Sequence, residues 1–293
     1  MITEEQYKLV AELIDKILDK KPIIKDDRYI STLQLGFELE KQLLESVRNN
    51  KFEMVYQPKF YNGKETKSAE ALFRTKESFR IRPDVAFTLF KLFGDEKEVV
   101  LKQLEVVARD TAKFKENINP NYRVSMNIAI DCIDEAFIKK LDQVVKKNNL
   151  NYRNVGIEIL ESENFDNLKN HMELIQQLHD RGALFAIDDF GSRNATDEAL
   201  DIMDFDIIKI DAHFLKYAES AHDYSKIKEL EEKIEREHPN STIVVEGVET
   251  REDVDELSST GIDQIYQGYY FSKPLTADQL LEKYSQKQPE PGE

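Results

Sequence analysis

The sequence predicts a modified parallel (β/α)8 barrel in which one strand is antiparallel, preceded by a helical extension. From about residue 122 onward, short apolar runs alternate with helical stretches, a pattern that requires crossover connections and a parallel sheet. The chain has 293 residues, enough for one large barrel or two ordinary domains. Polar residues recur at the downstream ends of the apolar runs, the end at which parallel barrels carry their functional groups.

The first segment of the chain predicts helices. Residues 3 to about 20 place their apolar side chains on one helical face. Pro22 interrupts this pattern, and a second helix is expected over about 35–49. We therefore expect residues 1–37 to form a helical extension that is separate from the barrel.

An Asn-Gly pair follows the second helix and predicts a hairpin. Asn62 and Gly63 separate two strand-like runs, about 52–60 and 65–74. This dipeptide is the strongest short hairpin signal, because both residues tolerate the positive φ that a tight turn needs. These two strands are therefore expected to be antiparallel, so that one of the eight strands is reversed.

The remaining elements alternate until the barrel closes. Helices are expected at about 84–92, 96–116, 134–148, 166–181, 195–203, 223–237, 250–260 and 276–286, and strands at 122–129, 154–160, 183–188, 206–211, 241–246 and 264–268. The barrel domain is thus expected over residues 38–286. The last residues, 287–293, have the composition of a disordered tail.

Composition excludes several classes of function. A formal net charge of -16 argues against binding a nucleic-acid polymer or an anionic membrane surface, because both would be repelled. Cys132 is the single cysteine, so no intrachain disulfide is possible and a reducing compartment is expected. The sequence has no signal peptide and no apolar run of the roughly 20 residues that span a bilayer. We expect a cytoplasmic protein without membrane insertion.

Carboxylates, amides and one lysine stand at or near the ends of successive apolar runs. These residues are Glu70, Asn127, Glu158, Glu161, Asp188, Asp189, Lys209, Glu246 and Gln267. An oxygen-rich set with few histidines suits hard divalent ions such as Mg²⁺ or Mn²⁺. The five histidines lack the spacing of a zinc site and are interpreted as surface residues.

The adjacent pair Asp188 and Asp189 is the most specific of these signals. Where a strand breaks into a loop, both side chains can turn inward, so that Asp188 bridges two ions and Asp189 holds the second. The alternative is that such acids only cap the following helices. That alternative is weaker for the set as a whole, because Glu, Lys and Gln are poor caps. Lys209 lies among apolar neighbours in its strand, and we expect its ammonium to point into the same mouth.

Eight ordered segments make the chain resemble the EAL-domain family over residues 38 to about 286. They are YQP (56–58), EALFR (70–74), SMN (125–127), EILE (158–161), DDFG (188–191), KID (209–211), EGVE (246–249) and QGYYFSKPL (267–275). The resemblance implies a modified TIM barrel that hydrolyses cyclic di-GMP to linear pGpG with two Mg²⁺ or Mn²⁺ ions.

The same resemblance implies roles for individual residues. The implied ligands are Glu70, Asn127, Glu158 and Asp188 for the first ion, and Asp188 and Asp189 for the second, to which Glu246 would bind directly or through water. Lys209 would orient the attacking water, Glu246 would accept its proton, and Glu70 counts with them as catalytic. Gln57 and Arg74 would contact the dinucleotide and Gln267 the water network, while Glu161 would steady the loop after DDFG.

That loop is where the sequence departs from the family pattern. Arg193, Asn194 and Ala195 stand where relatives that hydrolyse well have glycine, an aromatic residue and a hydroxyl residue. The loop couples the metal site to substrate binding and to the homodimer contact of the family. An active phosphodiesterase is therefore the first hypothesis, and a catalytically weak cyclic di-GMP receptor is the alternative. A scaffold without ligand fits the filled site poorly.

Overall fold

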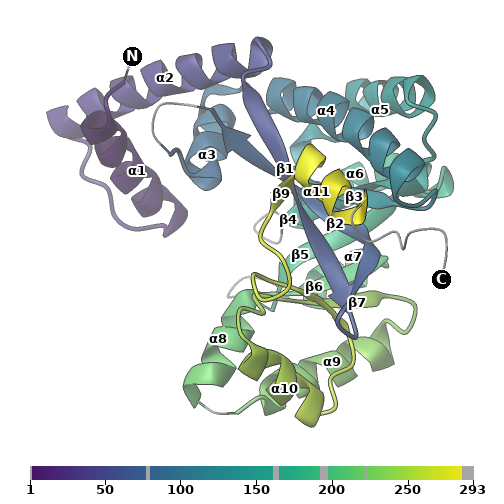
Figure 1. Cartoon of the computed structure of the whole chain (residues 1–293). Coiled ribbons are helices and arrows are strands. Elements are labelled where there is room, and N and C mark those ends of the chain that lie inside the picture. The colour runs from purple at the N-terminus through teal and green to yellow at the C-terminus, as the bar shows by residue number, and fades with distance from the viewer. Residues whose placement is uncertain (1, 77–79, 161–164, 192–196, 222, 286–293) are drawn as a thin grey trace. The chain divides into compact units, whose positions relative to one another are not determined.

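The computed structural model describes residues 2–76, 80–160, 165–191, 197–221 and 223–285 (Figure 1). The chain divides into two compact units. The helical unit consists of Met1–Met54 and Phe73–Val106, and the barrel unit consists of Val55–Leu72 and Val107–Glu293. None of the described helices is both long and apolar enough to cross a membrane.

The helical unit begins with two capped helices. Helix α1 spans Glu4–Leu18, and Thr3 caps it through a reciprocal pair of hydrogen bonds with Gln6. Helix α2 spans Asp27–Arg48 and starts well before the predicted residue 35. The reason is a local cap that the apolar pattern does not report: Asp26 accepts a hydrogen bond from the backbone N–H of Tyr29 at 2.9 Å.

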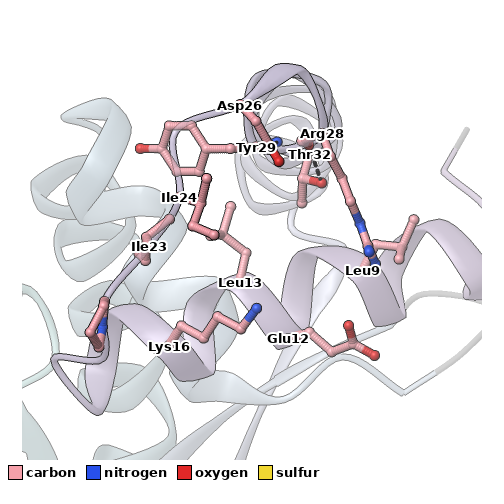
Figure 2. Close-up of a pocket in the computed structure, with 11 residues that line it drawn as sticks. Leu9, Glu12, Leu13, Lys16, Ile23, Ile24, Asp26, Arg28, Tyr29 and Thr32 are labelled. Carbon is pink, nitrogen blue, oxygen red and sulfur yellow. Dashed lines mark hydrogen bonds between the residues drawn. The ribbon is translucent and has the colours of Figure 1, made fainter.

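Helix α3 (Pro83–Phe93) and the first part of α4 (Glu96–Asn117) complete this unit. Gly36 of α2 allows a close approach to α3, because a Cβ at this position would lie 3.3 Å from Leu89. Helices α1 and α2 also border an open groove of about 290 Å³ (Figure 2). Leu13 of α1 and Ile24 of the connecting segment line it, and Ile24 is 81% exposed.

A closed ring of eight strands is present, as predicted, and all of it belongs to the barrel unit except one end each of β1 and β2. The strands are β1 (Phe52–Tyr61), β2 (Lys64–Thr75), β3 (Arg123–Asn127), β4 (Val155–Leu160), β5 (Leu184–Phe190), β6 (Ile207–Ile210), β7 (Thr242–Glu246) and β8 (Ile265–Gln267). Strands β2 to β8 are parallel neighbours in chain order. Strand β1 pairs antiparallel with β8 and also pairs with β2, which closes the ring.

The β1–β2 turn explains the reversed strand. Asn62 and Gly63 have φ values of 48° and 68°, the left-handed conformation that a two-residue hairpin requires at both positions. The predicted hairpin is therefore confirmed. A short strand, β9 (Leu275–Thr276), pairs antiparallel with the other end of β1 and was not predicted.

Helices connect the parallel strands, as the alternation predicts. They are α4, α5 (Glu135–Lys147), α6 (Phe165–Asp180), α7 (Asp197–Ile202), α8 (Ala212–Ala221), α9 (Ser225–Glu237) and α10 (Arg251–Ser259), with 3-10 turns at Ile130–Cys132 and Tyr152–Asn154. Helix α11 (Ala277–Ser285) follows the last strand, β9. Helix α8 was not expected. Its apolar face is short, and only Leu215 and Ala218 are buried among its residues.

Candidate functional site

All eight barrel strands send a polar side chain to one mouth of the barrel. The residues are Gln57 of β1, Glu70 of β2, Asn127 of β3, Glu158 of β4, Asp188 and Asp189 of β5, Lys209 of β6, Glu246 of β7 and Gln267 of β8. The register places Asn127 opposite Glu158 and Glu246 opposite Gln267 on neighbouring strands. Because the strands are parallel, residues far apart in the chain end at the same edge.

Lys209 lies at the centre of four carboxylates. Its ammonium Nζ is 2.6 Å from Asp188 Oδ1 and 2.8 Å from Glu158 Oε2. The same atom is 2.9 Å from Glu246 Oε1 and 3.2 Å from Glu70 Oε2. The Lys209 side chain is only 1% exposed, so these contacts are made away from water. The carboxylates of four strands therefore face a common point.

Amide side chains orient Glu70. Asn127 Nδ2 donates to Glu70 Oε1 at 2.8 Å, and Gln267 Nε2 donates to Glu70 Oε2 at 2.6 Å. Gln57 Oε1 accepts from Gln267 at 3.4 Å, and Gln57 Nε2 donates to the carbonyl of Ser272 at 3.2 Å. Two buried oxygens, Asn127 Oδ1 and Gln267 Oε1, have no hydrogen-bond partner among the described residues. Such atoms are costly to bury unless a ligand reaches them.

An irregularity in β5 lets two consecutive aspartates take part. The register with β6 shifts between Ile187 and Phe190, and Asp189 has a φ of 55°. In a regular strand Asp188 and Asp189 would point to opposite faces. Here carboxylate oxygens of Asp188, Asp189 and Glu246 all lie within 4.8 Å of one another.

Burial and nearby charges have opposite effects on the pKa values of the site carboxylates. Burial, reinforced by Glu246 and Glu70, raises the pKa of Asp188 well above its usual value. Burial likewise raises the pKa of Glu246 to about 7, although Lys209 opposes it. Burial also disfavours ionisation of Glu158, but Lys209 and Lys59 outweigh it and hold its pKa below the usual range.

The pKa of Lys209 itself is raised well above its usual value. Burial would lower it, and the four surrounding carboxylates reverse that effect. Lys209 and Lys59 offer two positive charges against four carboxylates at this mouth. A divalent cation bound here would favour the ionised forms of Asp188 and Glu246, whose pKa values are raised without it.

The donor set fits a hard divalent cation. Glu70, Glu158 and Asp188 form one group of carboxylate oxygens within 4.8 Å, and Asp188 shares a second group with Asp189 and Glu246. The unpartnered Asn127 Oδ1 adds a neutral oxygen at the same strand ends. Mutually close oxygens without sulfur or imidazole match the preference of Mg²⁺ and Mn²⁺.

The contacts described above do not test the roles predicted for Arg74 and Glu161. Arg74 belongs to the helical unit, and its Nη1 donates to the carbonyl of its neighbour Phe73 at 2.7 Å. Glu161 lies outside the described residues, as do the divergent loop positions 192–196.

Two residues of the site escaped prediction from sequence. Lys59 Nζ lies 3.0 Å from Glu158 Oε1, and Ser125 Oγ donates to the same oxygen at 2.5 Å. Both could have been found from strand alternation, since Lys59 follows Gln57 by two residues and Ser125 precedes Asn127 by two.

Known proteins resemble this chain in sequence and fold. The EAL domain family profile matches residues 40–274. Cyclic di-GMP phosphodiesterase PdeR of Escherichia coli (strain K12) is 29% identical over 248 residues, which cover 82% of this chain and 36% of PdeR. Cyclic di-GMP phosphodiesterase PdeL of the same strain is 30% identical over 172 residues, covering 57% of this chain and 46% of PdeL. The chain thus spans less than half the length of either relative.

Solved structures support the barrel fold independently. A structure of the EAL enzyme Bd1971, bound to cAMP and cyclic-di-GMP, superimposes with a TM-score of 0.77 at 21% identity. The match covers 96% of this chain and 76% of that chain.

Proposed function

Because this chain belongs to the EAL domain family, we propose that it is a metal-dependent phosphodiesterase that hydrolyses cyclic di-GMP to linear pGpG. The observation that carries the proposal is the convergence of four buried or half-buried carboxylates on one point at the barrel mouth. Two curated relatives are named for this activity.

The proposed ligands divide into two sets that share Asp188. Glu70, Asn127, Glu158 and Asp188 would hold one Mg²⁺ or Mn²⁺ ion, and Asp188, Asp189 and Glu246 would hold a second. Such a pair of ions activates a water and stabilises the phosphoryl oxygens of an in-line displacement. The two overlapping oxygen groups and the unpartnered Asn127 Oδ1 support this division.

The remaining residues would handle water, protons and substrate. Lys209, with its raised pKa, stays protonated and can donate hydrogen bonds that orient the attacking water. Glu246 has a pKa of about 7, which suits a group that accepts a proton near neutral pH. Gln267 would hold the water network, and Gln57 and Arg74 would contact the dinucleotide.

The test is direct hydrolysis by the purified chain. Protein incubated with cyclic di-GMP and Mg²⁺ or Mn²⁺ should yield pGpG, measured by chromatography, and chelation of the metal should stop the reaction. Tight binding of cyclic di-GMP by calorimetry with no pGpG would overturn hydrolysis and favour the receptor. Absence of both binding and product would overturn both.

A further inference from the structure

A pocket enters the barrel from the upstream ends of the strands, opposite the mouth, where the exposed residues Arg123, Asn240 and Thr242 line it. Side chains two residues upstream of the mouth residues face the same interior, because strands alternate with a period of two. Six of these residues line this pocket of about 210 Å³: Ser68, Ser125, Gly156, Ile207, Val244 and Ile265. Gly156 has to be small here, since a Cβ would lie 3.0 Å from the Cβ of Ser125.

One long side chain crosses this layer. Strand β1 runs against β8, so Lys59 lies one layer below Gln57 and also lines the pocket. The Lys59 side chain is 4% exposed. Its Nζ reaches upward to Glu158 Oε1 at 3.0 Å, and it lies 3.5 Å from Ser125 Oγ.

The two oxygens of Glu158 consequently have different partners. Oε1 is held from below by Lys59 and by the 2.5 Å hydrogen bond from Ser125. Oε2 faces the mouth, where Lys209 lies 2.8 Å away. Glu158 is fully buried, so these three donor atoms define its orientation without help from bulk water.

Packing of the barrel interior does not by itself explain why position 59 is a lysine. A buried ion pair is rarely more stabilising than apolar side chains of similar volume. The pocket beside Lys59 also reaches this layer, so the lysine does not fill it. What the ammonium adds is a directed positive charge against one chosen oxygen of Glu158.

We propose that Lys59 and Ser125 form a positioning pair that fixes Glu158 so that Oε2 is presented to the divalent cation at the mouth. Its effect on turnover rests on the proposed phosphodiesterase function, whereas its effect on metal affinity does not. Removing a group that hydrogen-bonds to a metal ligand commonly lowers metal affinity or activity by about 10–100-fold.

The first experiment compares Lys59→Met with wild type. Mn²⁺ affinity, measured by calorimetry, should fall by about 10-fold or more, and kcat for cyclic di-GMP should fall with little change in KM. Ser125→Ala should show a smaller loss, because it removes a neutral donor. Lys283→Met is the matched control, since Lys283 pairs with Glu65 at 3.0 Å in the same unit and touches no mouth residue among the described contacts. Circular dichroism verifies the fold of each variant.

The second experiment uses the pocket for chemical rescue and separates charge from packing. Lys59→Ala removes three methylene groups and the ammonium, which propylammonium replaces. Propylammonium should restore Mn²⁺ affinity saturably, whereas 1-propanol of the same size should not, and wild type should respond to neither.

The outcomes separate this inference from the proposed function. Wild-type Mn²⁺ affinity and kcat in Lys59→Met overturn the positioning pair, as does equal rescue of Lys59→Ala by propanol and propylammonium. If wild type forms no pGpG but Lys59→Met still weakens Mn²⁺ binding, the phosphodiesterase proposal fails and the positioning pair stands.

Discussion

Buried carboxylates occur in both units, and Glu158 of the barrel unit differs from Glu40 of the helical unit in the lysines that contact it. In the barrel unit Glu158 is fully buried, yet Lys209 and Lys59 hold its pKa low. In the helical unit Glu40 of α2 is 1% exposed, and burial together with Asp95 raises its pKa to about 7. Glu40 Oε1 has no hydrogen-bond partner among the described residues. Contact with two lysines, and not burial alone, separates the ionised Glu158 from Glu40, where burial favours the protonated form.

The distribution of charge follows the same division. Lysine and arginine nearly balance the acids in the helical unit, so nearly all of the formal charge of -16 belongs to the barrel unit. The acid surplus thus accompanies the unit with the candidate metal site. Variants that remove one buried acid from each unit test whether the two groups differ in function as they do in environment.

The largest expected effect comes from removing an acid of the barrel mouth. Glu70→Ala should lower turnover of cyclic di-GMP by about three orders of magnitude, because a proposed ligand to the cation is lost. Glu70 also accepts hydrogen bonds from Asn127, Gln267 and Lys209. The assay is pGpG formation, with Glu40→Gln as the matched loss of a buried acid that should keep wild-type turnover. Near-normal activity of Glu70→Ala would mean that the ligand assignment is wrong.

The second effect comes from changing the cation. Ca²⁺ in place of Mg²⁺ should reduce pGpG formation roughly 100-fold, because Ca²⁺ accepts looser oxygen geometry and longer bonds. Adding excess Mn²⁺ should restore activity, which controls for damage to the protein. Full turnover in Ca²⁺ alone would contradict the proposed two-ion site.

The third effect is a pH dependence of folding in the helical unit. Glu40 has a folded pKa of about 7 against a usual value of 4.5, so the folded state favours its protonated form. Stability from this group is therefore present at low pH and is lost as pH rises from about 4.5 to 7. Glu40→Gln should raise the free energy of unfolding relative to wild type by about 2 kcal/mol more at pH 8 than at pH 5.

Urea unfolding at the two pH values measures this difference. Glu38→Gln on the exposed face of α2 is the matched control, and its effect should stay within about 0.5 kcal/mol at both pH values. An equal effect of Glu40→Gln at pH 5 and pH 8 would show that Glu40 is ionised at both.

The smallest effect is expected in the groove between α1 and α2 (Figure 2). Ile24 is 81% exposed, so Ile24→Ser should change the free energy of unfolding by no more than about 0.5 kcal/mol. Leu13 lines the same groove but is 8% exposed, and Leu13→Ala should cost about 2 kcal/mol or more. Thermal or urea unfolding distinguishes the two, and a comparable loss in Ile24→Ser would mean that Ile24 packs in solution.

The sequence by itself determined the elements whose signals are local. Alternating apolar runs predicted the parallel strands, and Asn62 with Gly63 predicted the turn that reverses β1. Helix α8 was not predicted because its apolar face is short, and the early start of α2 was not predicted because it depends on a single capping aspartate. Neither feature changes the apolar periodicity much. Strand-end positions also identified most of the polar residues that meet at the mouth, whereas Gln57 was implied by the family resemblance alone.

Only the tertiary structure decided which of these side chains touch. Lys209 contacts Glu70 across 139 positions of sequence, and Lys59 contacts Glu158 across 99. The register shift in β5 brings Asp189 beside Asp188. Periodicity predicts the face of a strand on which a residue lies. The distances between side chains on different strands depend on the closure and register of the ring, which involve all eight strands at once.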